Sequence, residues 1–172
     1  MEITQEQFMN EIETIATTSS NFPGQEWTIV KTPAGSFVKH RSVEATADGL
    51  VLTKEYHICF NPSYGVPVLY FNIWTQDGKL LPIEQVWQLV CSSHKEAVLL
   101  DPWTAISQQE HPHLGAPWFH IHPCHTAKAM SKLSQSTTQF NYVLSWLSMF
   151  GPVVGLSIPN QMMTSIYKQA DK

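Results

Sequence analysis

The first hydrophobic residues of the chain recur at the spacing of an α-helix. Phe8, Ile12 and Ile15 fall on one side of a helix whose other positions are mostly polar, which is the pattern of an amphipathic helix. Thr4 has the side chain of a helix N-cap, and the polar run Thr17–Asn21 marks the end of the apolar pattern. We expect a short N-terminal helix that packs its apolar side on a sheet.

From Trp27 onward the period of the pattern changes to two, which indicates β-strands. Apolar and polar residues alternate along residues 50–60, as they do in a sheet with one buried face and one face in water. Two Asp-Gly pairs favour turns, because glycine adopts positive φ angles without strain. The pattern predicts an antiparallel meander of about four strands, at residues 27–31, 36–45, 50–60 and 66–74.

Helical spacing returns after the predicted sheet. One apolar stripe lies in residues 82–90 and a second in residues 140–150, and a proline or glycine borders each of them. We expect helices at both places, a short helix over residues 101–109, and a terminal helix from about residue 160. Because there is no internal repeat or linker, residues 1–172 are predicted to form a single α+β domain.

Cys124 lies near the end of a distinctive stretch, Trp118–Thr126. Pro123 fixes its own φ angle and holds the preceding residue extended, while a helical run begins at about His125. Cys124 is therefore predicted at a strand-to-helix junction, where backbone N–H groups stabilise a thiolate. A cysteine in such a polar junction is a candidate nucleophile.

The other two cysteines are expected to be structural. Cys59 falls on a predicted strand and Cys91 beside a helical apolar stripe, where cysteine usually acts as a small buried hydrophobic residue. An odd number of cysteines without Cys-x-x-Cys spacing argues against a disulfide framework. A reducing compartment, the cytoplasm, is the expected location.

Histidines close to Cys124 in the sequence raise the alternative of a zinc-binding module, since imidazole and thiolate are good zinc ligands. Their spacing matches no zinc pattern that we can define, and the prolines among them restrict how the ligands converge. We therefore expect no metal. The chain also has no glycine-rich phosphate loop, so no bound nucleotide or other cofactor is expected. The histidines are His111, His113, His120, His122 and His125.

Composition and charge disfavour several other classes. The chain has 172 residues, of which 43% are hydrophobic, and a net charge of −4, which argues against a surface that binds nucleic acid. The N-terminus is acidic and has no signal-peptide pattern. No apolar run reaches the ~18 residues of a membrane span. We expect a cytoplasmic protein without nucleic-acid partners and without stable membrane insertion.

Several short blocks together resemble a known family. A helix, a four-stranded meander, a cysteine loop and C-terminal helices follow the order of the ubiquitin-conjugating (E2) fold, but ordinary E2 enzymes carry His-Pro-Asn before their cysteine. Here His122-Pro123-Cys124 puts the cysteine in the place of the asparagine, as in the E2-like enzymes of autophagy. With Val66–Phe71, Gln108–Pro112, Tyr142–Ser148 and Gly151–Leu156, the chain resembles the autophagy-related protein ten family over about residues 50–160.

The resemblance implies an E2-like fold and a two-step transfer reaction. In the family, the E1-like autophagy-related protein seven uses ATP to activate the ubiquitin-like autophagy-related protein twelve. The terminal glycine of the ubiquitin-like protein then forms a thioester with the cysteine that matches Cys124, and is transferred to a lysine of autophagy-related protein five. The resemblance therefore implies a transferase of the ubiquitin-like conjugation pathway in autophagy.

Other side chains are expected to support this transfer. Because the cysteine replaces the asparagine that is thought to stabilise the oxyanion in E2 enzymes, our hypothesis gives part of that role to other polar groups. Tyr56 or His57, on the sheet face predicted to be exposed, and Thr126, beside the cysteine, are the candidates. His122 and His125 flank the cysteine and are candidate binding residues.

Two further alternatives stay open. The sister E2-like enzyme of the lipid-conjugation branch also uses a His-Pro-Cys cysteine, but its acidic insertion and amphipathic membrane helix are not found in this sequence. An E2-like scaffold would bind partners without forming a thioester. For partner docking, the natural candidate is the edge of the meander, where an added strand would pair with Ser36–Ala45.

Overall fold

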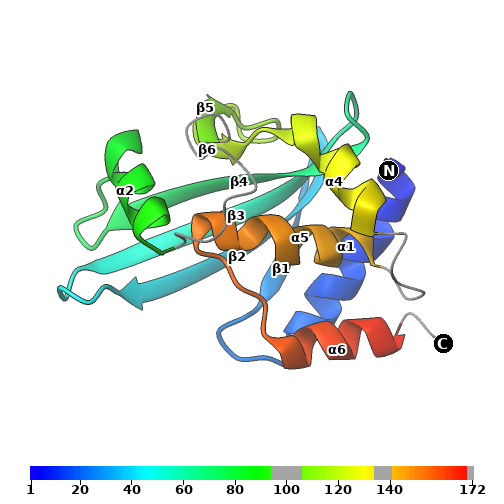
Figure 1. Ribbon diagram of the computed structural model, residues 1–172, viewed down its shortest axis with the longest axis horizontal. Helices are drawn as coiled ribbons and strands as arrows, with labels where there is room; N and C mark the ends of the chain where they lie inside the picture. The colour runs from blue at the N-terminus through cyan, green and yellow to red at the C-terminus, as the bar shows by residue number, and fades with distance from the viewer. Residues whose placement is uncertain (94–105, 134–140, 170–172) are drawn as a thin grey trace.

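An antiparallel sheet of six strands forms the middle of the computed structural model, which describes residues 1–93, 106–133 and 141–169 (Figure 1). The strands lie in the order β1-β2-β3-β4-β6-β5. The first four strands pair with their sequence neighbours, so the predicted meander is confirmed. The strand bounds are β1 Trp27–Thr32, β2 Gly35–Ala45, β3 Val51–Asn61, β4 Val66–Thr75, β5 Ile106–Glu110 and β6 Pro117–Ile121.

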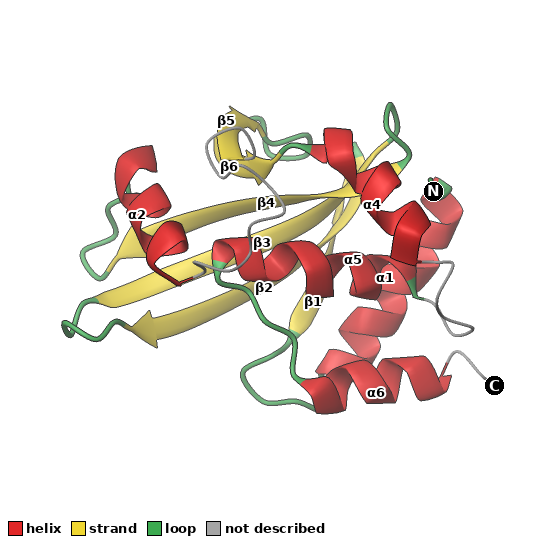
Figure 2. Ribbon diagram, in the orientation of Figure 1, coloured by secondary structure: helices red, strands yellow, loops and turns green. Residues whose placement is uncertain are grey.

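Helices cover one face of this sheet, which we call the inner face (Figure 2). The predicted helices near residues 82–90 and 140–150 and from residue 160 are confirmed for the residues that the structure describes. None of the helices in these ranges is long and apolar enough to cross a membrane. The helical segments are α1 Gln5–Ser19, α2 Ile83–Ser93, η1 Pro123–His125, α4 Thr126–Leu133, α5 Tyr142–Phe150, η2 Gly151–Val154 and α6 Asn160–Gln169.

The N-terminal helix α1 begins where the sequence predicts. The hydroxyl of Thr4 accepts the backbone N–H of Gln7 at 3.1 Å, which is the geometry of an N-cap. The three apolar residues of its predicted stripe are fully buried in the core. One turn further, Oε2 of Glu11 accepts the backbone N–H of Val143 at 2.7 Å. α1 therefore holds the first turn of α5 as well as the sheet.

The helix predicted over residues 101–109 is wrong in the part that the structure describes. Residues 106–110 form the edge strand β5, which pairs with β6 from Ile106↔Ile121 to Glu110↔Pro117. Residues 101–105 lie outside the described ranges. The two strands form a hairpin whose turn uses Gly115 at a φ angle of 65°. Pairing with a neighbouring strand here outweighs the weak local preference of the segment.

The expectation that one face of the sheet lies in water holds for only part of the outer face, where Arg41 and Val43 are exposed, because a second cluster of buried side chains occupies the rest. The β5–β6 turn, residues 111–116, is fastened across this face. Its His113 places Nδ1 at 3.0 Å from Oγ1 of Thr32, in the β1–β2 hairpin. We call the buried residues of this face the outer cluster: Phe37, Cys59, Val68, Tyr70 and Trp118.

Candidate active site

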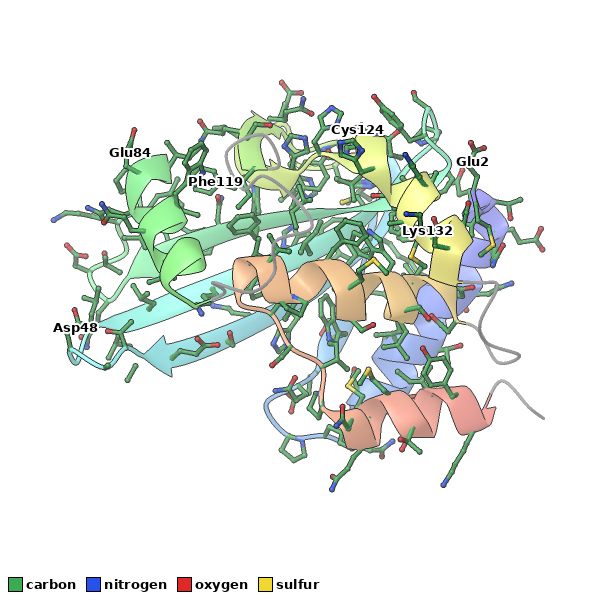
Figure 3. The ribbon with its side chains drawn as sticks, viewed as in Figure 1. Glu2, Asp48, Glu84, Phe119, Cys124 and Lys132 are labelled. Atoms are coloured by element: carbon green, nitrogen blue, oxygen red, sulfur yellow. The ribbon has the colours of Figure 1, made fainter. Side chains whose placement is uncertain are left out.

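Cys124 lies in a single turn of 3-10 helix that joins β6 to α4, so the predicted strand-to-helix junction is confirmed (Figure 3). Pro123 is buried at the start of this turn, while the Cys124 side chain is exposed. By contrast, Cys59 is buried, and its burial raises the pKa of the thiol far above the usual range. Of these two thiols, only that of Cys124 can meet a partner protein.

The side chain of His122 fixes the backbone of the cysteine. Its backbone is extended, with φ −65° and ψ 129°, and its Nδ1 accepts the backbone N–H of Cys124 at 3.2 Å. Because a backbone N–H can only donate, Nδ1 of His122 carries no proton in this arrangement. The other predicted flanking residue, His125, is exposed at the end of the turn. His122 is thus a positioning residue for the cysteine.

Thr126 closes the turn from its other side. Its backbone N–H donates to the carbonyl oxygen of Pro123, and its side chain is buried at the first position of α4. Cys124 therefore sits between two fastened residues, His122 and Thr126, at the N-terminal end of a helix. Partial positive charge at such an end stabilises an anionic sulfur.

Tyr64 belongs to this site although the sequence pattern did not single it out. Its ring lies edge-on to that of His122, with centroids 6.0 Å apart and planes at 81°, and 42% of the residue is exposed. The turn that presents it is fixed, because Oδ1 of Asn61 accepts the backbone N–H groups of Ser63 and Tyr64. The sequence marks a turn here, but nothing in it places that turn beside residue 122.

The structure does not place Tyr56 on an exposed face. Tyr56 lies on the inner face of β3 and is 1% exposed. Its hydroxyl donates to the carbonyl oxygen of Val154 at 3.0 Å, and burial raises the pKa of that hydroxyl well above its usual range. The expectation for this residue was wrong because the even-numbered side of β3 lies beneath the helices. Its polar group supports η2.

His57 points to the opposite face of β3, and it is buried as well, at 2% exposure. Its Nε2 donates to Glu55 at 2.8 Å, its Nδ1 lies 3.0 Å from Nε2 of His111, and its ring stacks on Trp118 with centroids 4.2 Å apart. The expectation of an exposed position was wrong because residues 111–116 cover the outer face. Among the three residues expected to support the reaction, Thr126 is the one that directly adjoins the Cys124 turn.

Four of the five histidines predicted near the cysteine divide into two groups, and the fifth, His120, is buried on β6 with Nδ1 3.1 Å from the carbonyl oxygen of Ser107. His111 and His113 lie in the turn over the outer cluster, while His122 and His125 flank Cys124. Within residues 1–93, 106–133 and 141–169, no three His, Cys, Asp or Glu side chains are arranged to hold a metal ion. The zinc alternative therefore has no ligand set in that part of the chain.

The chemistry that this geometry supports is acyl transfer through a thiol. The cysteine is accessible and its backbone is fixed, which are the conditions that a carrier thiol requires. Two exposed lysines, Lys128 and Lys132, follow on α4, and Figure 3 shows Lys132 further along that helix from Cys124. The surroundings of the sulfur are therefore open enough for a protein substrate to approach.

Comparison with known proteins gives the same picture. Residues 5–161 match the family described as autophagocytosis associated protein, active-site domain. The ubiquitin-like-conjugating enzyme ATG10 of Homo sapiens is 42% identical over 121 residues, which are 68% of this chain and 55% of that protein. The ATG10 enzyme of Arabidopsis thaliana is 37% identical over 133 residues, 73% of this chain and 59% of that protein. The matched part of this chain thus spans somewhat more than half the length of these relatives.

The fold has a solved counterpart. A crystal structure of the autophagic E2 Atg10 superposes with a TM-score of 0.60, covering 89% of this chain and 98% of the other, at 16% sequence identity. At that identity the likeness concerns the fold. The predicted E2-like α+β fold is confirmed, with a six-stranded sheet in place of the four strands that the pattern resolved.

Proposed function

We propose that this chain, which belongs to the ATG10 family of autophagocytosis-associated proteins, is an E2-like transferase that carries a ubiquitin-like protein as a thioester on Cys124. The supporting observation is the exposed cysteine in a fixed turn at the start of α4, with its amide held by His122. The relatives of the chain are named as ubiquitin-like-conjugating enzymes. A carrier cysteine is the feature that such an activity requires.

The transfer proceeds in two steps. First, the Cys124 thiolate attacks the thioester carbonyl that joins the terminal glycine of the ubiquitin-like protein to the E1-like enzyme; a new S–C bond forms and the E1 thiolate leaves. Second, a lysine amine of the target attacks this carbonyl, the Cys124 thiolate leaves, and the nitrogen loses a proton to form an isopeptide bond. Two thioester steps replace one difficult reaction of an amine with a carboxylate.

The proposed partners are those that the family resemblance implies. They are the E1-like autophagy-related protein seven as donor, the ubiquitin-like autophagy-related protein twelve as cargo, and a lysine of autophagy-related protein five as acceptor. The net charge of −4 gives no reason to add a nucleic acid. The surface expected to pair with a partner strand, Ser36–Ala45 of β2, is smaller than the sequence suggested. β2 is flanked by β1 as far as His40, so only Arg41–Ala45 has an open side for a partner strand.

Support for the oxyanion is proposed to come from the residues at the cysteine turn. The polar atoms of Tyr56 and His57 are already bonded, to Val154 in the first case and to His111 and Glu55 in the second. We therefore assign the oxyanion-supporting role to Thr126, which adjoins the Cys124 turn, and a positioning role to the ring of Tyr64, which faces His122. Removal of an oxyanion donor typically lowers a rate about 100- to 1,000-fold.

A loading assay tests this function. The chain is incubated with the E1-like enzyme, ATP and the ubiquitin-like protein, and the products are separated on non-reducing gels. We expect a thiol-sensitive adduct that is lost in Cys124→Ala and becomes thiol-resistant in Cys124→Ser, because an ester replaces the thioester. Cys59→Ala is the matched control and should load like the natural chain, since its sulfur is buried.

Two alternatives would give different results in the same assay. No adduct on a folded chain, with a charged E1-like enzyme, would contradict the carrier role and favour an E2-like scaffold. Transfer to phosphatidylethanolamine in vesicles, and not to the protein target, would identify the lipid-conjugation branch. The similarity to named ATG10 enzymes favours the protein target.

A further inference from the structure

A linear series of hydrogen bonds links four residues on the outer face of the sheet. The backbone N–H of His113 donates to Nδ1 of His111 at 3.2 Å. Nε2 of His111 lies 3.0 Å from Nδ1 of His57, and Nε2 of His57 lies 2.8 Å from Oε1 of Glu55. We call these four residues, Glu55, His57, His111 and His113, the histidine clasp.

One backbone amide determines the position of every proton in this series. Because the His113 N–H can only donate, Nδ1 of His111 must accept and its Nε2 must carry the ring proton. That proton is donated to Nδ1 of His57, so the second ring also carries its proton on Nε2 and donates it to the Glu55 carboxylate. With one proton on the ring of His111 and one on that of His57, each ring nitrogen has one hydrogen-bond partner.

An additional proton cannot be placed on either ring without breaking a bond. A proton on Nδ1 of His111 would face the N–H of His113, and one on Nδ1 of His57 would face the N–H of His111. His111 is 0% exposed, so water cannot replace the lost partner. In agreement with this geometry, burial lowers the pKa of His111 to about 3, and His57 and His113 add to the effect.

The Glu55 carboxylate, 2.8 Å from Nε2 of His57, would stabilise a positive charge on that ring, whereas burial and the neighbouring His57 and His113 disfavour one on His111. Lys39 and Arg41 on β2 act on Glu55 from the same face and help to hold its pKa below the usual value, after the hydrogen bond from His57. The other groups packed around the clasp are uncharged at neutral pH. Two of them, Phe37 and Trp118, have no titratable group. Burial raises the pKa of the Cys59 thiol, raises that of Tyr70 to about 12, and lowers that of His120. Within the clasp, His113 is bonded to Thr32.

The clasp matters for Cys124 because it is one of a few attachments of β6 to the meander on this side, beside the contacts of Tyr70 with His120 and of Trp74 with Trp118. β6 shares two register pairs with β4, whereas β3 and β4 share ten. On the outer face, Trp118 of β6 stacks on His57 of the clasp. Three residues beyond the end of β6 lies the cysteine. Side chains of the clasp therefore hold one end of a short strand whose other end leads directly into the Cys124 turn.

We propose that the histidine clasp keeps the β5–β6 hairpin on the sheet only while the His111 ring is neutral, and that it thereby positions the Cys124 turn and sets a lower pH limit for transfer. The part that concerns transfer rests on the proposed function. When the clasp opens, His111 gains the ordinary imidazole pKa of ~6.5, so its opening constant rises about 25-fold between pH 7 and pH 5.

Hydrogen exchange of the whole chain at pH 7 and pH 5, corrected for intrinsic rates, tests the first part. The amides of His111, Leu114 and Gly115, which are bonded within the β5–β6 turn, should lose about 25-fold or more of their protection, while those of the β3–β4 ladder keep theirs. In His111→Gln, whose amide group still donates to His57 but takes up no proton, this loss should shrink. The exposed residue His125 gives the control His125→Gln, which should behave like the natural chain.

Three results would overturn the proposal. They are unchanged protection of the turn at pH 5, an equal loss in β3–β4, and the same pH response in His111→Gln. If that variant fails to fold, nitrogen spectra of the histidine rings in the natural chain decide. The His111 ring should be neutral with its proton on Nε2 at pH 6, and a charged His111 ring in the folded chain would refute the clasp.

Thioester loading at pH 7 and pH 5 tests the second part. We expect the yield of the natural chain to fall more steeply than that of His111→Gln, because only the former loses its clasp. Equal declines would refute the positioning role. Absence of loading at every pH would instead contradict the proposed function, and it would leave the exchange result valid.

Discussion

The inner face of the meander and the part of its outer face beneath residues 111–116 are both buried, but by different chemistry. The inner face is covered by α1, α5 and α6 and is filled mainly by hydrocarbon side chains and large rings such as Phe71. The buried part of the outer face is covered by a turn, and neutral imidazoles lie among its aromatic rings. The burial of hydrocarbon side chains does not depend on pH and needs no particular orientation of the groups. Each buried imidazole, in contrast, requires a hydrogen-bond partner and a fixed protonation state. The stability of the packing on the outer face therefore depends on pH.

Neighbouring residues of β3 show the contrast at single-residue scale. Tyr56 uses its hydroxyl once, to bond Val154 in η2, and otherwise packs as an inner-face ring. His57, one position later, bonds both of its ring nitrogens and stacks on Trp118. Alternate residues of one strand thus contribute to an inner face whose packing should not depend on pH and to an outer face whose packing should weaken at low pH.

Truncation of the inner face should have the largest effect. Phe71→Ala removes a 0% exposed ring that contacts Tyr56 and Phe119, and such a change in a core costs about 3–5 kcal/mol. Urea denaturation at pH 7 should show this loss, with the same cost at pH 5 and pH 7. Val43→Ala, at a 66% exposed position, is the control and should stay within about 0.5 kcal/mol. A pH-dependent cost at Phe71 would contradict the distinction between the faces.

Acidification should destabilise the chain through the outer face. Unfolded His111 binds a proton below pH ~6.5, but the folded residue does so only near its pKa of about 3. The unfolded state therefore binds more protons between these values, and stability is lost as the pH falls through this window. Between pH 7 and pH 5 the loss from this residue is about 2 kcal/mol. The contribution of this residue should level off above about pH 7.5.

The variant His111→Gln identifies the source of that loss. Its midpoint in urea should depend less on pH than that of the natural chain, whatever its stability at pH 7. Parallel curves for the two chains would show that other groups cause the decline. Burial also lowers the pKa of His113 and His120, so part of the slope should persist in the variant.

Local signals allowed much of the fold and the position of the nucleophile to be predicted. The start of α1 follows from Thr4 and a periodic apolar stripe, and the junction at Cys124 follows from a proline between a strand and a helix. These features depend on residues within one or two turns of each other. The same holds for the turns of the meander, where glycine decides the backbone conformation.

The features that were missed depend on contacts between distant residues. The approach of Tyr64 to His122 spans 58 positions (122 − 64) and needs the β3–β4 turn to meet the end of β6. The contact of His57 with His111 needs a turn to cross the sheet, and β5 needs β6 as a partner. The alternation of apolar and polar residues along a strand shows which residues share a side of the sheet, but it does not show which other parts of the chain cover that side. For this reason Tyr56 and His57 were expected in water.

Tyr56→Phe should have a moderate effect on stability and little effect on loading. The change removes the hydroxyl that donates to Val154, and a buried carbonyl without its donor costs about 1–2 kcal/mol. The rate of thioester formation should remain that of the natural chain when both are folded at pH 7. A rate loss of about 100-fold at unchanged stability would restore Tyr56 as an oxyanion donor.

The smallest effect on stability is expected at Tyr64, where the effect on the reaction should be specific. The ring is exposed on one side and contacts His122 with its other side, so Tyr64→Ala should change the free energy of unfolding by less than about 0.5 kcal/mol. It should slow transfer from loaded Cys124 to a lysine acceptor by about 2- to 12-fold, the equivalent of an aromatic contact of ~0.5–1.5 kcal/mol. Single-turnover discharge of the purified thioester measures this step without the E1-like enzyme.

Tyr64→Phe separates the two ways in which this residue can act on the cysteine turn. If the ring positions His122, and through it the amide of Cys124, the phenylalanine variant should discharge at the natural rate while Tyr64→Ala is slow. If the hydroxyl contacts the reacting carbonyl, both variants should be slow to the same extent. Discharge at the natural rate in both would contradict a role for Tyr64 in the site. The outer face would then act on Cys124 only through β6, which is the effect that the experiments on the histidine clasp measure.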